Sequence, residues 1–336
     1  MGNGRALEGF ATDWRSLARG KYVAVDSDPS GAALTLSHHF GGNATPPEFR
    51  DDLAAGAALK WAASPERDAR LNGARVVYND HFDVDGFLAA WVVLHPDEAL
   101  GLRREVLAAA AAGDFDEWTG ESAVKFAILG EWIDDPKFSR VAREALKVRG
   151  KGGEAALYEA VLRELPELLA HPENLEELWR RPFDEVVGQV RLFESGRALT
   201  VERPEGHLTM VRAPRLLLSR AVVARSKGDR LLQAAEVDGG FMYQFRYRPY
   251  LGYRIVSRAT SRAHELDRVA AELNRRWPRG DEAWKARGWW SRELRLYASR
   301  VGRRRLPKTE PDEALRAFEE TFAALDRENV GNAEGG

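Results

Sequence analysis

A short apolar run that is followed at once by a histidine and several acids constrains the fold of this 336-residue chain most strongly. Arg75-Val76-Val77-Tyr78 has the β-branched and aromatic composition of a strand, and Phe87 to His95 is apolar enough for a helix. The residues between them are Asn79-Asp80-His81-Phe82-Asp83-Val84-Asp85-Gly86. Gly86 is expected to allow a sharp turn from strand to helix. Strand-to-helix turns of open α/β sheets bind ligands, so we expect a binding site here.

Strand and helix patterns alternate through the first part of the chain. Strands are predicted over residues 22–26, 33–37 and 75–80, and helices over residues 51–63, 86–95 and a stretch that ends at 108–112. This alternation predicts an α/β fold with a doubly wound, mostly parallel sheet. Apolar residues recur at helical spacing through residues 121–195, so a helical insert is expected to follow.

The chain changes character after residue 195. Strands are predicted over residues 199–203, 208–213, 231–237 and 241–247, and a helix over 266–277. Asp238-Gly239-Gly240 is typical of a hairpin turn between the last two strands. We therefore predict two domains, an α/β domain of residues 1–195 that includes the helical insert and a smaller α+β domain of residues 196–336.

The composition excludes several classes of protein. The chain has no cysteine, which excludes a disulfide framework, a thiolate zinc site and a cysteine nucleophile. No secretion signal and no apolar run of roughly 20 residues is present, so we expect a cytoplasmic protein without a membrane partner. The net charge is −2, yet residues 241–305 hold 17 Arg or Lys and 6 Asp or Glu. This basic stretch suits a phosphorylated or nucleic-acid ligand, or it is a solvated surface.

Acids and histidines stand where predicted strands or helices end. The residues are Asp26, His38, His39, His81, Asp83, Asp85 and Asp114. The carboxyl ends of parallel strands meet at one edge of a sheet, so these side chains can converge. Oxygen and imidazole ligands without sulfur favour Mn²⁺ or Mg²⁺. Six or seven such ligands could hold two ions about 3.5–4 Å apart, an arrangement that promotes in-line phosphoryl displacement.

Each of these residues also has a simpler interpretation. The acids around Asp83 could cap a helix, and Asp114 could be a turn acid at a helix end. Asp26 competes with Asp28, which could open a turn. Neighbouring side chains on a strand point in opposite directions, so His38 and His39 are not expected to face the same way. Asp80 is expected to orient His81 rather than to bind metal.

The motif His81-x-Asp83-x-Asp85-Gly86 resembles the first motif of the DHH phosphoesterases. Ser37-His38-His39 is similar to the Asp-His-His motif of that family, with serine in the first place. The resemblance places His38 at the position of the family's metal-ligating histidine, so it favours His38 over His39 as the ligand. Asp26 would correspond to the second-motif acid that bridges the metals, and Gly113-Asp114 resembles the fourth motif. Residues 253–262 and the following helix are similar to the family's small substrate domain, in which an Arg-Ser strand leads into a helix.

The chain departs from the family pattern in two respects. The segments that resemble the second and third motifs precede the first, so the motif order is permuted. The glycine-rich segment of the substrate domain is missing, and residues 279–290 occupy its place. The resemblance thus indicates a divergent branch of the family, whose substrate differs or whose catalytic activity has been lost.

The resemblance implies a Mn²⁺-dependent phosphoesterase that acts on a nucleotide or short oligonucleotide with two ions, which could also be Mg²⁺. Asp26, His38, His81, Asp83, Asp85 and Asp114 would hold the metal, with His81, Asp83, Asp85 and Asp80 in the catalytic set. Arg258, Arg262 and His39 would contact the substrate phosphate. The alternatives are a catalytically degenerate nucleotide- or partner-binding protein and a single-metal hydrolase of another ester or amide. A homodimer is possible in either case.

Overall fold

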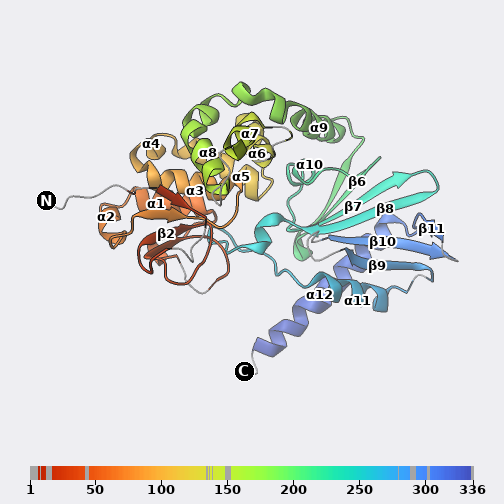
Figure 1. Cartoon of the computed structure of the whole chain (residues 1–336). Helices are drawn as coiled ribbons and strands as arrows, with labels where there is room; N and C mark the ends of the chain where they lie inside the picture. The colour runs from red at the N-terminus through yellow and green to blue at the C-terminus, as the bar shows by residue number, and fades with distance from the viewer. Residues whose placement is uncertain are drawn as a thin grey trace. The chain divides into compact units, whose positions relative to one another are not determined.

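The computed structural model describes two compact units (Figure 1). The residues described are 7, 9–12, 17–41, 45–133, 135, 137, 139–147, 153–278, 280–287, 293–300 and 303–333. The first unit consists of Met1–Asp184 and Gly252–Ala259, and the second of Glu185–Leu251 and Thr260–Gly336. The units therefore divide inside helix α9 (Glu176–Glu194), whereas the predicted boundary at residue 195 falls just after that helix.

A four-stranded parallel sheet lies at the centre of the first unit. Its strands are β1 (Gly9–Ala11), β2 (Tyr22–Val25), β3 (Leu34–Leu36) and β4 (Val76–Tyr78), in the order β1-β4-β2-β3. All three strand pairs are parallel, which confirms the predicted α/β class. All four residues of β2 are buried, as expected for a strand of a parallel sheet with a continuous apolar sequence.

Helices α1 (Ala54–Ala62) and α3 (Val84–Leu94) pack against each other and against this sheet. Alanine makes up most of α1, and eight of its nine residues are buried, so small side chains permit a close approach. The other helices of the unit's first part are α2 (Arg67–Arg70), α4 (Pro96–Gly101) and α5 (Arg103–Asp114). In the described part of residues 121–195 the chain forms helices, as predicted. They are α6 (Glu121–Trp132), α7 (Arg140–Lys147), α8 (Gly153–Ala170) and α9.

The second unit has an α+β structure around a mixed sheet. Its strands are β5 (Leu199–Arg203), β6 (Leu208–Ala213), β7 (Arg230–Val237), β8 (Gly240–Tyr247), β9 (Glu282–Arg287), β10 (Glu293–Arg300) and β11 (Arg303–Arg305). The order is β11-β10-β8-β7-β6-β5, with β9 paired to β10. Its helices are α10 (Ser219–Val223), α11 (Leu266–Arg276) and α12 (Pro311–Ala333). Gly239, with φ of 87°, closes the predicted hairpin between β7 and β8.

Aromatic side chains from β8 and α12 form the core of this unit. Phe245 stacks on Phe318 with ring centroids 4.8 Å apart, and both side chains are fully buried. The stripe of aromatic residues along β8 therefore stabilises the sheet–helix contact and is not free to stack on bases. No helix in the described part of the chain has both the length and the apolar character needed to cross a bilayer.

One predicted strand is absent from the structure. Residues 253–262, which resemble the strand before the substrate-domain helix, form neither helix nor strand. Gly252–Ala259 belong instead to the first unit, and this irregular segment lies beside the residues described next.

Candidate metal centre

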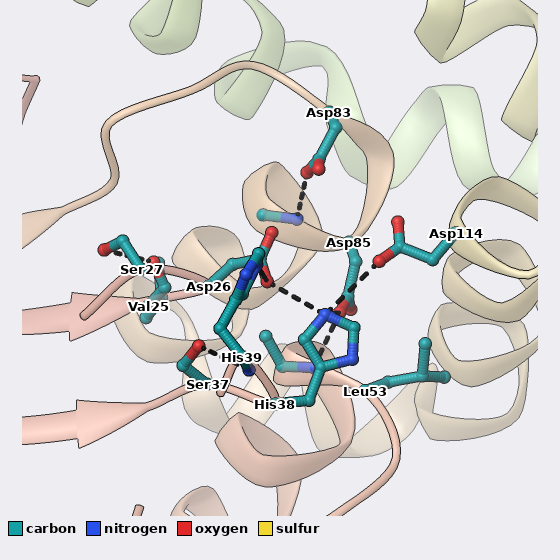
Figure 2. Close-up of polar contacts among 12 residues, drawn as sticks. Val25, Asp26, Ser27, Ser37, His38, His39, Leu53, Asp83, Asp85 and Asp114 are labelled. Carbon is teal, nitrogen blue, oxygen red and sulfur yellow. Dashed lines mark hydrogen bonds and ion pairs between the residues drawn. The ribbon is translucent and has the colours of Figure 1, made fainter. Parts of the chain in front are cut away.

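The acids and histidines singled out from the sequence converge at the carboxyl edge of the parallel sheet, and Figure 2 labels all of them except His81. Asp26 directly follows β2, and His38 and His39 follow β3. Asp83 precedes α3 and Asp85 lies in its first turn, whereas Asp114 is the last residue of α5. With His81, which follows β4, strand ends and helix ends from separate parts of the first unit thus bring seven side chains to one place.

Asp26 lies between two groups of these side chains. Its Oδ1 atom is 3.2 Å from His38 Nε2 and 3.1 Å from His39 Nε2, and its Oδ2 atom is 3.1 Å from His81 Nε2. The residue is completely buried, and its backbone φ is 46°, in the left-handed region. Residues other than glycine rarely adopt this conformation, and those that do cluster at functional sites.

The buried group consists of Asp26, His38, Asp85 and Asp114. His38 Nε2 lies 3.7 Å from Asp85 Oδ2 and 3.4 Å from Asp114 Oδ2. Figure 2 shows the His38 imidazole turned toward these carboxylates. His38 Nδ1 is 2.6 Å from the carbonyl oxygen of Asp52, which can only accept a hydrogen bond. Nδ1 therefore carries a hydrogen, and in the neutral ring Nε2 presents its lone pair to the centre of the cluster.

Asp85 is held by the amino end of α1. Its two carboxylate oxygens accept hydrogen bonds from the backbone N–H groups of Ala54 and Ala55, at 2.6 and 2.8 Å. Such N–H groups at a helix start lack partners within the helix, and the helix dipole favours a negative charge there. These contacts fix the orientation of a carboxylate that is completely buried.

The second group is half-exposed and contains His39, His81 and Asp83 beside Asp26. His38 and His39 lie beyond the end of β3 and both face Asp26 Oδ1, so the predicted opposite orientation of these two side chains is wrong. His81 Nε2 lies 3.0 Å from Asp83 Oδ2, and about a third of each of these side chains is exposed. His81 Nδ1 is 2.8 Å from Asp80 Oδ1, so Asp80 orients His81 as expected. Asp83 also caps α3, because its Oδ1 atom accepts the N–H of Gly86 at 2.8 Å. The capping and cluster interpretations of Asp83 therefore apply together.

The chemistry of these donors fits divalent cations. Asp26 Oδ2, His38 Nε2 and Asp114 Oδ2 are buried, and none makes a hydrogen bond of acceptable geometry with the described residues. Buried polar atoms without hydrogen bonds are rare, and an ion is one of the few explanations for them. Three such atoms meet here in a set of oxygen and imidazole donors without sulfur, which suits Mn²⁺ or Mg²⁺.

The electrostatics of the cluster also favour a positive charge. Burial, together with the nearby Asp114 and Asp26 carboxylates, raises the pKa of Asp85 well above its ordinary value. Burial raises the pKa of Asp114 to about 7. For His38, burial lowers the pKa, but the close carboxylates of Asp114, Asp26 and Asp85 outweigh it and raise the pKa to about 11. Protons are retained where carboxylates crowd together, and a cation would replace them.

We expect the metal-free protein to lose stability as the pH rises above 7. The folded pKa of His38, about 11, exceeds its unfolded value, so its contribution is complete below pH 6.5 and is lost as the pH rises through 11. Release of one proton corresponds to about 1.4 kcal/mol of unfolding free energy per pH unit. Urea unfolding in EDTA at pH 7, 8 and 9 measures this slope. Saturating Mn²⁺ should abolish this dependence of the unfolding free energy on pH. An unfolding free energy that does not change with pH in EDTA would refute the raised pKa of His38.

Gly86 has a different role from the one predicted. Its φ is not positive, because it lies within α3, so no sharp turn depends on it. A Cβ atom at this position would lie 2.1 Å from Asn79 Nδ2, 2.8 Å from Asp83 Oδ1 and 3.2 Å from Asp26 Oδ2. Glycine is needed here because the metal-centre side chains occupy the space of a side chain.

The family model of DUF6687, a family of unknown function, matches residues 10–314. The chain belongs to this family. No curated protein and no solved structure shows a significant match to the chain. The matched range contains the whole cluster from Asp26 to Asp114, together with the segment 252–259.

The two arginines assigned to the substrate are not equivalent. Arg258 lies in the first unit, where its Nη2 atom is 2.9 Å from Glu117 Oε1. Arg262 belongs to the second unit and is exposed, and its carbonyl oxygen accepts a hydrogen bond from Arg230. Neither stands at the end of a strand, so the predicted strand-end position of the two arginines is wrong. Their contact with a substrate stays a prediction.

Several supporting residues were not predicted from the sequence. Asn79 is completely buried and donates a hydrogen bond from Nδ2 to the hydroxyl of Tyr158, 2.9 Å away. That hydroxyl donates to the carbonyl oxygen of His81, so α8 supports the loop that carries His81. The only sequence signal was the position of Asn79 directly after an apolar strand. Its partner, Tyr158, lies 79 positions away in the sequence.

Proposed function

We propose that this protein is a metal-dependent phosphoesterase that hydrolyses a phosphodiester or phosphoanhydride in a nucleotide or short oligonucleotide. The observation that carries the proposal is the convergence of three histidines and three further aspartates around Asp26, with three buried donor atoms left without hydrogen bonds. The similarity of His81-x-Asp83-x-Asp85 to the DHH motif supports the same reaction. The relationship to that family stays a prediction.

The two groups of ligands suit two cations that share Asp26. His38, Asp85 and Asp114 would hold one, and His39, His81 and Asp83 the other, with Asp26 contributing to both. Bound divalent cations would activate water and stabilise negative charge on the phosphoryl oxygens. Asp80 and the Asp52 carbonyl keep the imidazoles of His81 and His38 in the orientation that ligation requires.

A cavity beside the centre gives the phosphoryl group a place to bind. It has a volume of about 220 Å³ and is lined by Phe82, Asp83, Val84, Gly113, Asp114, Gly130 and Glu131. Asp83 and Asp114 belong to both the cavity and the metal cluster, so a ligand in the cavity would reach the cations. The volume is below that of ordinary drug-sized sites, which favours the end of a chain or a small phosphate ester over a duplex.

The acidic character of the centre makes substrate binding depend on metal. Carboxylates of Asp26, Asp83, Asp85 and Asp114 would repel a phosphate unless cations neutralise them. The substrate should therefore bind only after Mn²⁺. Arg258 could assist by exchanging Glu117 for a substrate phosphate. A cytoplasmic location of the reaction and a homodimeric protein also belong to this proposal.

The test is turnover with Mn²⁺ on dinucleotides, cyclic dinucleotides and pyrophosphate, with wild type and Asp83→Asn compared. Asparagine caps helices as well as aspartate, so the variant should keep its stability within about 0.5 kcal/mol. It loses a charged ligand, and we expect at least ~100-fold lower turnover, beyond the usual effect of changing a supporting residue.

Asp97→Asn is the matched control, because Asp97 is an exposed acid of the same unit whose side chain pairs with Arg67. It should leave turnover unchanged. Mn²⁺ binding without hydrolysis of any of these substrates would refute the enzyme proposal and favour a nucleotide- or partner-binding protein on the same scaffold.

A further inference from the structure

The segment Gly252–Ala259, here called the strap, lies against the buried half of the metal centre. It belongs to the first unit, although the residues on either side of it belong to the second. Within the strap, the ring of Tyr253 stacks on the imidazole of His38, with centroids 4.1 Å apart and planes 13° apart. The same ring meets His39 edge-on at 5.2 Å. One aromatic side chain thus contacts a histidine from each group of ligands.

Hydrogen bonds hold the strap in this position. The N–H of Arg254 donates to the carbonyl oxygen of His38 at 2.8 Å. The N–H groups of Val256 and Ser257 donate to Asp52 Oδ1, at 2.7 and 2.9 Å, and the Ser257 hydroxyl donates to Asp52 Oδ2. Four hydrogen-bond donors of the strap therefore bind either His38, which would ligate the metal, or Asp52, which contacts His38.

Asp52 connects the strap to the metal centre. Its side chain binds the strap, whereas its backbone carbonyl accepts the hydrogen bond from His38 Nδ1. Two and three residues later, the N–H groups of Ala54 and Ala55 hold the carboxylate of Asp85. A displacement of Asp52 would therefore move the groups that orient both His38 and Asp85.

We propose that the strap is a positioning element whose docking is coupled to metal binding, with Tyr253 as the residue that fixes the plane of the His38 imidazole. The inference rests on the metal centre of the proposed function and adds a regulatory contact from a distant part of the chain. Coupling of this kind is reciprocal. Bound metal must therefore favour the docked strap by the same factor by which docking of the strap increases the metal affinity.

Two residue exchanges separate positioning from simple packing. Tyr253→Phe keeps the flat ring over His38, whereas Tyr253→Leu keeps an apolar side chain and removes the ring. Loss of a residue that supports a metal ligand reduces metal affinity about 10- to 100-fold. We expect Tyr253→Leu to weaken Mn²⁺ binding by about 10-fold, and Tyr253→Phe to bind as tightly as wild type.

Hydrogen exchange of the full-length protein measures the reverse direction. In wild type, saturating Mn²⁺ should slow exchange of the Arg254, Val256 and Ser257 amides relative to EDTA by at least ~10-fold, matching the affinity change by reciprocity. Tyr253→Leu should show a smaller slowing. Equal Mn²⁺ affinities of the Phe and Leu variants, or strap exchange that does not respond to Mn²⁺, would overturn the inference.

These measurements do not depend on catalysis. Coupling in a protein that hydrolyses no phosphoester would refute the proposed reaction and leave the strap inference standing. Hydrolysis with a strap that is insensitive to Mn²⁺ would overturn the strap inference and leave the proposed reaction standing. A protein that binds no Mn²⁺ would overturn both.

Discussion

Asp26→Asn is expected to abolish Mn²⁺ binding at both positions of the centre and to reduce hydrolysis at least ~1000-fold, more than the loss of a supporting residue causes. Asp26 contacts histidines of both groups of ligands, because its Oδ1 atom faces His38 and His39 and its Oδ2 atom faces His81. Removal of any other single ligand affects one of the two metal positions and leaves the ligands of the other position intact. Removal of the shared carboxylate charge weakens both positions together.

Asparagine is the appropriate replacement for a residue with φ of 46°. Asparagine tolerates the left-handed region well, whereas alanine there would add backbone strain. A loss of metal binding in Asp26→Asn can then be attributed to the missing charge. Calorimetric titration with Mn²⁺ provides the measurement, with Asp97→Asn as the control. Unchanged affinity in Asp26→Asn would show that Asp26 does not bind the metal.

Gly86→Ala should destabilise the protein and disrupt the metal centre. Alanine is favoured over glycine in a helix by roughly 1 kcal/mol, but the new methyl group would lie 2.1 Å from Asn79 Nδ2. Asn79 cannot move freely, because it is completely buried and bonded to Tyr158. Overpacking of this kind costs about 1–3 kcal/mol, so we expect a net loss of up to about 2 kcal/mol and weaker Mn²⁺ binding.

Gly101→Ala is the matched control for this exchange. Gly101 is also a helical glycine of the first unit, and a Cβ there would meet nothing within 4 Å. Its substitution should be neutral or stabilising by up to about 1 kcal/mol. Thermal and urea unfolding of both variants, with and without Mn²⁺, measure the difference. If Gly86→Ala behaves like Gly101→Ala, the glycine is not required by the metal centre.

The sequence predicted those parts of the fold whose patterns are local. β2, β4 and α3 have unmistakable apolar runs, and the hairpin at Gly239 follows from its turn residues. β1 has only three residues, Gly9–Ala11, and its sequence gives no period to detect. The irregular structure of residues 253–262 was missed because the pattern there resembles a strand, while hydrogen bonds to Asp52 and His38 determine its conformation.

The same distinction applies to the site. Asp26, His38 and Asp85 were identified because carboxyl ends of parallel strands share an edge, which is a rule that topology supplies. Residues that act through long-range contacts gave no such signal. Tyr253 lies more than 200 positions from His38, and Tyr158 lies 77 positions from His81, so only the folded structure brings them together.

Anomalous X-ray diffraction from crystals grown with Mn²⁺ tests the central claim most directly. Two anomalous peaks are expected, both in contact with Asp26, one also bounded by His38, Asp85 and Asp114, and the other by His39, His81 and Asp83. The absence of any peak in contact with Asp26 would contradict it.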